Sequence, residues 1–255
     1  MKILSLGWGV QSFTLAAMVA LGELEPIDYA IHADTTHESQ RTYEFVNRWK
    51  WWLHDKGVKI VTVTHENRDR IDPFIFSQRK QVFIPAFTND IKGNHGQLLR
   101  QCSKDWKINV MRRHIQKTRN GERVEQWLGI SLDEFKRMKD SDVGYITNRF
   151  PLIEKKMTRI DCEKWLTEKG IEIPAKSACT FCPYRDTEQW RLIKSNKKDW
   201  EEATAVDRVL RNARPDMSTY IHPSRKPLTE VDFSTSEEQG QLSLWDNECE
   251  GICGV

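Results

Sequence analysis

The chain has 255 residues, enough for one sizeable core or for one domain with an extension. Its 39 Lys and Arg residues nearly balance its 37 Asp and Glu residues, so the overall charge favours no class of partner. No apolar run approaches the roughly 20 residues of a membrane helix, and no signal-peptide pattern is present, so we expect a cytoplasmic protein without a membrane partner.

Strands and helices alternate over the first sixty residues. The pattern predicts strands at residues 2–4, 27–33 and 58–63, separated by helices at 13–21 and 42–56. This alternation is typical of an α/β fold with an open, mostly parallel sheet flanked by helices. In such sheets ligands bind beyond the carboxyl ends of the strands.

The later elements are shorter and less regular. The pattern predicts a strand at 83–87, a loop at 88–96 that could cover a site, a helix at 103–116, a strand at 124–130, a short helix begun by a capping box at 131–134, a helix at 158–170, an amphipathic helix at 188–211 and an extended tail beyond Pro215. We therefore expect one domain over residues 1–190, followed by a C-terminal helix and tail over 191–255.

A glycine-containing loop joins the first strand to the first helix. This layout presents unpaired backbone N–H groups and the positive end of a helix to an anion. The candidate phosphate ligands in and beside the loop are Ser5, Gly7, Gly9, Gln11 and Ser12. An ordinary turn between a strand and a helix is the alternative. Asp34 ends the second predicted strand, so we expect it at the same edge of the sheet.

Three cysteines form a candidate metal site. Cys179 and Cys182 have the spacing that lets two thiolates bind one metal centre. Cys102 begins a basic helix, which we expect to lower the pKa of its thiol. Together the three could hold an iron–sulfur cluster and leave one iron open. Zinc on the same residues, a dithiol redox pair and inert buried thiols are the alternatives.

The remaining cysteines differ in their surroundings. Cys162 lies within a predicted helix beside apolar residues, so we expect structural burial. Cys249 and Cys253 lie in an acidic tail that contains seven Asp and Glu residues and no Lys or Arg from Pro227 onward. A tail thiolate could act as a nucleophile, a redox partner or a further cluster ligand.

Basic residues gather between positions 100 and 123. Eight Lys and Arg residues stand there against two acidic ones, and Arg100, Lys104 and Lys107 lie nearest to Cys102. Such a stretch could bind phosphate groups, including those of RNA or DNA. A solvated helix face is the alternative.

These motifs together resemble the PP-loop superfamily, and within it the phosphoadenosine phosphosulfate (PAPS) reductase-like family. The resemblance covers residues 3–190 and rests on segments 7–12, 34–45, 100–108, 151–153, Trp165 and 177–182. The ending Cys-Glu-Gly-Ile-Cys-Gly-Val resembles that of a bacterial and phage set within this family. The resemblance implies an adenine nucleotide site and a 4Fe-4S cluster on Cys102, Cys179 and Cys182.

The chain also departs from the family pattern. Gln101 stands where cluster-bearing reductases have the first cysteine of a pair, which leaves three family ligands. The tail imitates the family's nucleophilic Glu-Cys-Gly ending without matching it. Gln11 replaces the aspartate of members that cleave ATP.

The resemblance implies two enzymatic readings. In the first, Arg100, Lys104 and Lys107 neutralise an adenosine sulfonucleotide, Cys249 or Cys253 attacks its sulfur atom, and an external thiol resolves the product. In the second, ATP, with or without Mg²⁺, activates a carbonyl oxygen of a tRNA, DNA or nucleobase, and sulfide from a donor displaces AMP at the open iron. A non-catalytic nucleotide-binding module is the third reading.

Overall fold

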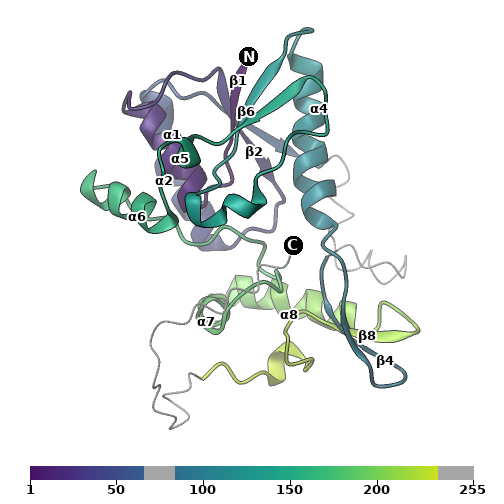
Figure 1. Cartoon of the computed structure of the whole chain (residues 1–255). Coiled ribbons are helices and arrows are strands. Elements are labelled where there is room, and N and C mark those ends of the chain that lie inside the picture. Colours follow the sequence, from purple (N-terminus) through teal and green to yellow (C-terminus); the bar gives the residue numbers. More distant parts are fainter. Residues whose placement is uncertain (66–83, 235–255) are drawn as a thin grey trace.

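A parallel sheet of five strands organises the first part of the molecule (Figure 1). The computed structural model describes residues 1–65 and 84–234. All neighbouring strands of this sheet run parallel. In spatial order they are β3 (Ile60–Thr64), β2 (Tyr29–Asp34), β1 (Lys2–Ser5), β6 (Val124–Trp127) and β7 (Ile146–Arg149).

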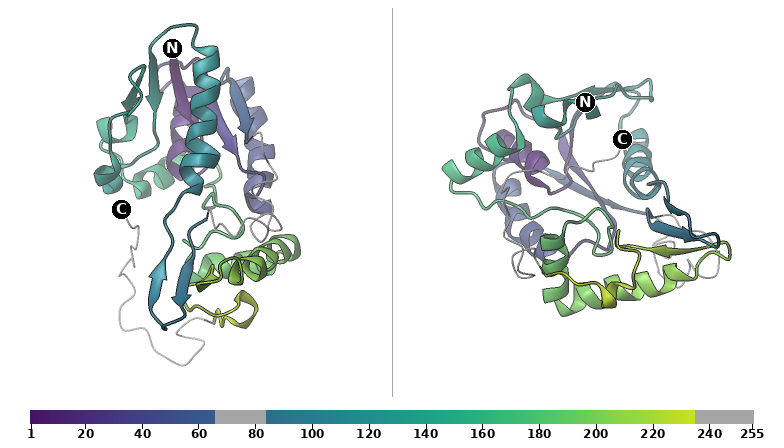
Figure 2. Two further views of the ribbon diagram at one scale, coloured as in Figure 1. Left: turned by 90° about the vertical axis from the view of Figure 1, so that its right-hand side faces the viewer. Right: turned by 60° about the horizontal axis from the view of Figure 1, so that its bottom comes forward.

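Helices cover both faces of the parallel sheet (Figure 2). They are α1 (Val10–Ala20), α2 (Gln40–Asp55), α4 (Asn109–Thr118), α5 (Pro151–Glu154) and α6 (Arg159–Glu168). Leu4 packs in the core formed with α1, α2 and α6, whereas its neighbour Ile3 packs on the opposite side, in the core that includes Ile115 of α4. Because both faces are buried, β1 and β2 are almost continuously apolar, and this is why the sequence predicts them.

The α/β fold with a parallel central sheet is thus confirmed, as are the strands and helices predicted for residues 2–63. The predicted helix at 158–170 is also present as α6. Thr158 caps it, because its side chain accepts a hydrogen bond from the Asp161 N–H group (3.2 Å) and the Asp161 carboxylate accepts one from the Thr158 N–H group (2.9 Å). The chain leaves α6 through Gly170, which has a φ of +67°.

A second, smaller unit packs below the carboxyl edge of the parallel sheet (Figure 1). It contains a three-stranded antiparallel sheet in the order β5-β4-β8. Its elements are β4 (Phe87–Asp90), β5 (His95–Gln97), α7 (Thr187–Ser195), α8 (Lys197–Arg211), β8 (Met217–Tyr220) and the 3₁₀-helix η4 (Leu228–Glu230). Its core takes Ile84, Trp106, Phe181 and Trp190 together with later residues such as Leu210 and Phe233.

Several predictions for this second unit are wrong. Of the strand expected at 83–87, residue 83 lies outside the described residues, and of residues 84–87 only Phe87 belongs to a strand. The loop expected at 88–96 is the hairpin of β4 and β5. The single helix expected at 188–211 breaks at Asn196, whose side chain accepts hydrogen bonds from the Lys198 and Asp199 N–H groups and so begins α8. Up to residue 234, the segment after Pro215 forms β8 and η4 instead of an extended tail, and the rest of the expected tail lies outside the described residues.

Two further predictions concern boundaries. The 3₁₀-helix η3 (Leu132–Arg137) forms after Ser131, but no side-chain hydrogen bond caps it, so the capping box expected there is wrong. The domain boundary at residue 190 stays a prediction, and the second core takes side chains from both sides of it.

None of the helices in residues 1–65 and 84–234 combines the length and apolar character needed to cross a membrane.

Candidate functional site

The loop after β1 ends at an open helix N-terminus. Gly9 is the N-cap of α1, with extended backbone angles (φ −86°, ψ 169°), and no side chain caps the helix. The first N–H groups of α1 therefore lack side-chain partners, which is the arrangement that binds anions. A Cβ atom on Gly9 would meet no protein atom within 4 Å. Space thus remains beside the loop.

Trp8 anchors this loop. Its φ of +58° lies in the left-handed region, which non-glycine residues rarely adopt. The side chain is 1% exposed, and its ring packs on Phe13, with ring centres 6.0 Å apart, and on Phe45. Aromatic packing thus holds a backbone conformation that costs energy locally, as is common in ligand-binding loops.

Polar side chains stabilise the same loop and the neighbouring strand ends. The Ser12 hydroxyl accepts a hydrogen bond from the Gly7 N–H group and donates one to the Gly9 carbonyl, both at 3.2 Å. Ser5 accepts a hydrogen bond from Gln126 (2.6 Å). The Gln11 amide nitrogen lies 3.4 Å from both the Ser131 hydroxyl and the Glu134 carboxylate. Gln11 thus already contacts the loop after β6.

Gly129 was not singled out from the sequence. A Cβ atom there would lie 2.7 Å from the Ser12 nitrogen and 2.8 Å from the Ser12 Cα atom, distances that real contacts do not show. The loop after β6 therefore packs directly on the first turn of α1. The strand predicted at 124–130 ends at Trp127, and a glycine just beyond a strand end was the available signal.

Asp34 lies at the end of β2, as predicted. Its carboxylate accepts hydrogen bonds from the Thr36 N–H group (2.8 Å) and the Tyr43 hydroxyl (3.0 Å). Burial and the Asp34 charge raise the pKa of Tyr43 above its ordinary value, so the phenol remains protonated. These two residues line a hollow of about 190 Å³ together with Trp8, His32 and Lys50.

The cysteine loop is joined to the end of β2 by its backbone. Cys179 forms an isolated antiparallel bridge with Glu38, and the Thr180 N–H group donates a hydrogen bond to the His37 carbonyl (2.8 Å). The Cys179 sulfur lies 3.3 Å from the Thr35 hydroxyl. The motif around Cys179 therefore reaches the same sheet edge as Asp34.

An ion pair between the partly exposed Lys107 and the buried Glu38 lies beside Cys179. Lys107 donates a hydrogen bond to Glu38 (3.0 Å), whose second carboxylate oxygen accepts one from Ser177 (3.2 Å). Glu38 is 2% exposed. Burial alone would lower the pKa of Lys107, but Glu38 and the thiols of Cys179 and Cys182 raise it above its ordinary value. Lys107 therefore stays charged next to the cysteines.

Cys102 approaches from the other side of the site. It precedes the π-helix η2 (Ser103–Ile108), which runs directly into α4 and contacts β2. Such π-turns are frequent at functional sites. Cys102 and Cys179 both pack against the second core, and a charge on Cys182 would raise the pKa of either thiol. Cys102 and Cys179 thus both lie beside the second core.

Burial decides the protonation of these thiols. It raises the pKa of Cys102, and the charges of Arg100 and Lys107 offset this only in part. The expectation that the basic helix lowers this pKa is therefore wrong. Burial, followed by the Glu38 charge, raises the pKa of Cys179 to about 12. A cationic metal centre would supply the charge compensation that thiolates need here.

The described residues contain no preformed metal site. Within residues 1–65 and 84–234, no three His, Cys, Asp or Glu side chains are close enough to hold one metal ion. The metal site on Cys102, Cys179 and Cys182 therefore stays a prediction, as does the choice between a 4Fe-4S cluster and zinc.

The remaining predicted residues are placed as follows. Cys162 is fully buried in the first core within α6, as expected, and burial raises its pKa to about 12. The Arg100 guanidinium lies 5.6 Å from the centre of the Tyr184 ring, on the cysteine side, and Lys104 is exposed on η2. Cys249 and Cys253 lie outside the described residues.

A network between the two units was also missed from the sequence. The His37 ring nitrogen lies 2.5 Å from one oxygen of Glu202 on α8, and Thr180 donates a hydrogen bond to the other (2.6 Å). Arg185 is 9% exposed and donates hydrogen bonds to the carbonyl oxygens of Ala178 (2.9 Å) and Cys179 (2.8 Å). These residues hold the cysteine loop from the side of the second unit.

The fold and site define an α/β protein with an uncapped helix N-terminus after β1 and with Cys179 bridged to the segment after β2, at one sheet edge. The structure is similar to a phosphoadenylyl-sulfate (PAPS) reductase from Candida auris, solved as a phosphate complex, at 10% identity and a TM-score of 0.46, over 70% of this chain and 80% of that one.

It is also similar to the U34-tRNA thiolase of Methanococcus maripaludis with its 4Fe-4S cluster, at 12% identity and a TM-score of 0.41, over 83% of this chain and 71% of that one. No family model matches the sequence, and no curated protein does. Likenesses this distant assign neither a reaction nor a substrate to this chain.

Proposed function

We propose that this chain is a nucleotide-binding enzyme of sulfur chemistry that carries a 4Fe-4S cluster on Cys102, Cys179 and Cys182. One observation supports the proposal: Cys179 is bridged to Glu38 just after β2, beside the Lys107–Glu38 ion pair, at the sheet edge where the open N-terminus of α1 also lies. An anion at that helix end and a sulfur centre at the cysteines would therefore be neighbours.

The favoured reaction is reduction of an adenosine sulfonucleotide. The loop around Gly7 and Gly9 binds phosphate, Asp34 contacts the nucleoside, and Arg100, Lys104 and Lys107 compensate the negative charge. A thiolate of Cys249 or Cys253 attacks the sulfur atom, so an S–S bond forms, the S–O bond breaks and the nucleotide leaves with the oxygen. Two equivalents of an external thiol then release sulfite, restore the cysteine and form a disulfide. A cluster bound at the three cysteines would supply positive charge beside the sulfonate.

Metal content tests the cysteine assignment. Protein purified without oxygen is analysed for iron, sulfide and zinc, in the wild type and in Cys102→Ala and Cys179→Ala. We expect about four irons per chain in the wild type and their loss in both variants. The matched control is Cys162→Ala, because Cys162 lies in the other core and should leave the iron content unchanged. Zinc in place of iron, or equal iron in all variants, would refute the cluster.

The reaction is tested separately. The enzyme is incubated with PAPS or with its analogue lacking the 3′-phosphate, in the presence of a dithiol, and sulfite is measured. We expect sulfite release that is lost when Cys249 and Cys253 are both changed to Ser. Full turnover in the double variant would remove the tail cysteines from the mechanism.

One observation favours a second function, ATP-dependent sulfur transfer to a tRNA, DNA or nucleobase. Of the four cysteines in the described parts of the chain, Cys162 is buried in the first core, which leaves Cys102, Cys179 and Cys182 as candidate ligands. A cluster on three cysteines has one iron free to bind sulfide. The test is cleavage of ATP to AMP and pyrophosphate with tRNA or DNA present, and its absence with every nucleic acid offered would reject this function.

The third possibility, a non-catalytic nucleotide-binding module, has its own mark. Its cysteines Cys102, Cys179 and Cys182 would lie too far apart to share a metal. Within residues 1–65 and 84–234 no three His, Cys, Asp or Glu side chains are close enough to hold one metal ion, which agrees with this mark. Binding of nucleotide without sulfite release, ATP cleavage or a cluster would support the module.

A further inference from the structure

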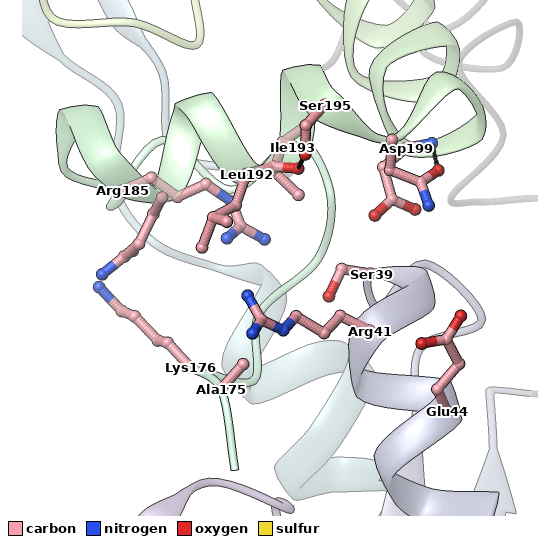
Figure 3. Close-up of a pocket in the computed structure, with 12 residues that line it drawn as sticks. Ser39, Arg41, Glu44, Ala175, Lys176, Arg185, Leu192, Ile193, Ser195 and Asp199 are labelled. Carbon is pink, nitrogen blue, oxygen red and sulfur yellow. Dashed lines mark hydrogen bonds between the residues drawn. The ribbon is translucent and has the colours of Figure 1, made fainter. Parts of the chain in front are cut away.

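A second polar cavity lies between the two units, and the residues that line it have no role in the proposed function. It measures about 260 Å³ and is bounded by the start of α2, the segment 175–185 and the helices α7 and α8 (Figure 3). Arginine side chains from two of these elements enter it, Arg41 from α2 and Arg185 from the segment after the cysteine loop. The cavity thus has donors from separate parts of the chain.

Arg185 is buried and incompletely satisfied. It is 9% exposed, and its Nη2 atom donates to the two carbonyl oxygens of the cysteine loop. Its Nε atom is buried and has no hydrogen-bond partner among the described residues. A buried guanidinium N–H group without an acceptor costs free energy. An oxyanion in the cavity would provide that acceptor.

Arg41 adds a second guanidinium group. It makes no hydrogen bond or ion pair with the rest of residues 1–65 and 84–234, and Figure 3 shows it extending from α2 toward the same space as Arg185. Lys176 lies at the rim, where its amine donates to the Tyr184 carbonyl (2.9 Å). Glu44 and Asp199 also line the cavity, and Asp199 is already bonded to the Gln40 N–H group (3.0 and 3.2 Å).

Two convergent guanidinium groups match a tetrahedral oxyanion. Arginine binds phosphate through paired, charge-assisted hydrogen bonds, which a lysine amine cannot reproduce. The cavity is larger than such an anion requires, since the share of one water molecule is about 30 Å³. Leu192 and Ile193 give it an apolar wall. These features fit an anion that carries an organic group.

We propose that this cavity binds the phosphate group of a small phosphomonoester, with Arg41 and Arg185 as its donors. Arg185 also donates hydrogen bonds to the carbonyl oxygens of Ala178 and Cys179, so a ligand bound to Arg185 would also stabilise the position of the cysteine loop. Inorganic phosphate is the other source of the same chemistry. The proposal does not depend on the reaction at the cysteines.

Isothermal titration calorimetry in a low-salt, phosphate-free buffer tests it, with glycerol 3-phosphate and inorganic phosphate as separate probes. Arg41→Gln is the main variant, because Arg41 is exposed and makes no hydrogen bond or ion pair with the described residues whose loss could unfold the protein. We expect saturable binding of glycerol 3-phosphate, weakened at least about tenfold in Arg41→Gln. The matched control is Arg48→Gln on the same helix, which pairs with Glu172 outside the cavity and should bind as the wild type does.

Three results would overturn the proposal. The first is the absence of saturable binding, and the second is equal affinity in Arg41→Gln and the wild type. The third is equal affinity for inorganic phosphate, which would assign the cavity to the free ion. Ser12→Ala separates this site from the β1–α1 loop. Binding that is lost in Ser12→Ala and kept in Arg41→Gln belongs to the loop, whereas the opposite result supports the cavity.

Discussion

Gly129 shows how one residue without a side chain sets the geometry of the loop between β1 and α1. Since no Cβ atom fits between it and Ser12, the loop after β6 lies directly against the first turn of α1. Any larger residue must push these two segments apart. The open helix N-terminus therefore depends on a strand that is distant in sequence.

Gly129→Ala tests this contact. We expect the free energy of unfolding in urea to fall by about 1–3 kcal/mol, the usual cost of overpacking. The matched control is Gly144→Ala, because a Cβ atom at Gly144 meets nothing within 4 Å. Equal stability of the two variants would show that the first turn of α1 moves away at little cost.

His32 makes stability depend on pH. Burial lowers its pKa, although Glu38 and Asp34 act in the opposite direction, and its Nδ1 atom lies 3.1 Å from the Leu6 carbonyl oxygen. Below about pH 6.5 the unfolded chain takes up a proton that the folded chain refuses, so acid favours unfolding. Above that pH neither state is protonated and the effect vanishes.

We therefore expect the free energy of unfolding to fall between pH 7 and 5.5. The slope should be smaller in His32→Asn, which keeps a donor near Leu6 without titrating, by up to about 1.4 kcal/mol per pH unit. Urea unfolding at both pH values measures the difference. Identical slopes would mean that His32 is charged in the folded protein.

At the scale of elements, the sequence predicts the helices and strands in which buried apolar residues recur with a regular spacing or form a continuous run. The strands β1 and β2 are apolar because helices cover both faces, and α6 carries a real capping box. The strands of the second sheet are short and polar, and β4 pairs with β8 from the far end of the chain. Such pairing leaves no local signal in the sequence, whose pattern therefore predicts a loop for β4 and β5 and a tail for β8.

The two capping patterns permit a matched comparison. Thr158→Ala removes a side-chain cap from α6, and we expect it to cost about 1 kcal/mol of unfolding free energy. Ser131→Ala should cost less, because Ser131 has the same pattern in sequence but caps nothing, and its hydroxyl meets only Gln11 at 3.4 Å. Thermal unfolding of both variants measures this, and the reverse order would contradict the assignment of the caps.

The candidate site was only partly predictable for a similar reason. Cys102, Cys179 and Cys182 follow from a motif and a resemblance, and Asp34 follows from its place after a strand. Glu38, Ser177 and Arg185 matter because of what they touch across the fold, and no spacing in the sequence marks them. The pKa of Cys102 was misjudged because burial, which the sequence does not show, outweighs the neighbouring charges.

At the scale of the whole molecule, the second core depends on the segment after α8. Ile221, Leu228, Val231 and Phe233 are at most 7% exposed there. Each such side chain contributes about 1.5–3 kcal/mol when fully buried, as an upper estimate. The second unit therefore cannot be complete without residues well past Pro215.

Two shortened chains test this dependence. A chain ending at residue 214 loses all four side chains and β8, so we expect a lower urea midpoint or insolubility, with the parallel sheet less affected. A chain ending at residue 234 keeps every described contact and serves as its control. Equal unfolding midpoints for the two would show that the second core does not need this segment.

The backbone bridge between Glu38 and Cys179 has a mechanical consequence. Because the cysteine loop is fastened to the tip of β2 through main-chain atoms, and β2 is hydrogen-bonded along β1, a displacement of the strand carries the sulfur atoms with it. The hydrogen-bonded strands thus set the distance between the β1–α1 loop and Cys179. Side-chain substitutions around the thiols can change their chemistry while leaving that distance unchanged.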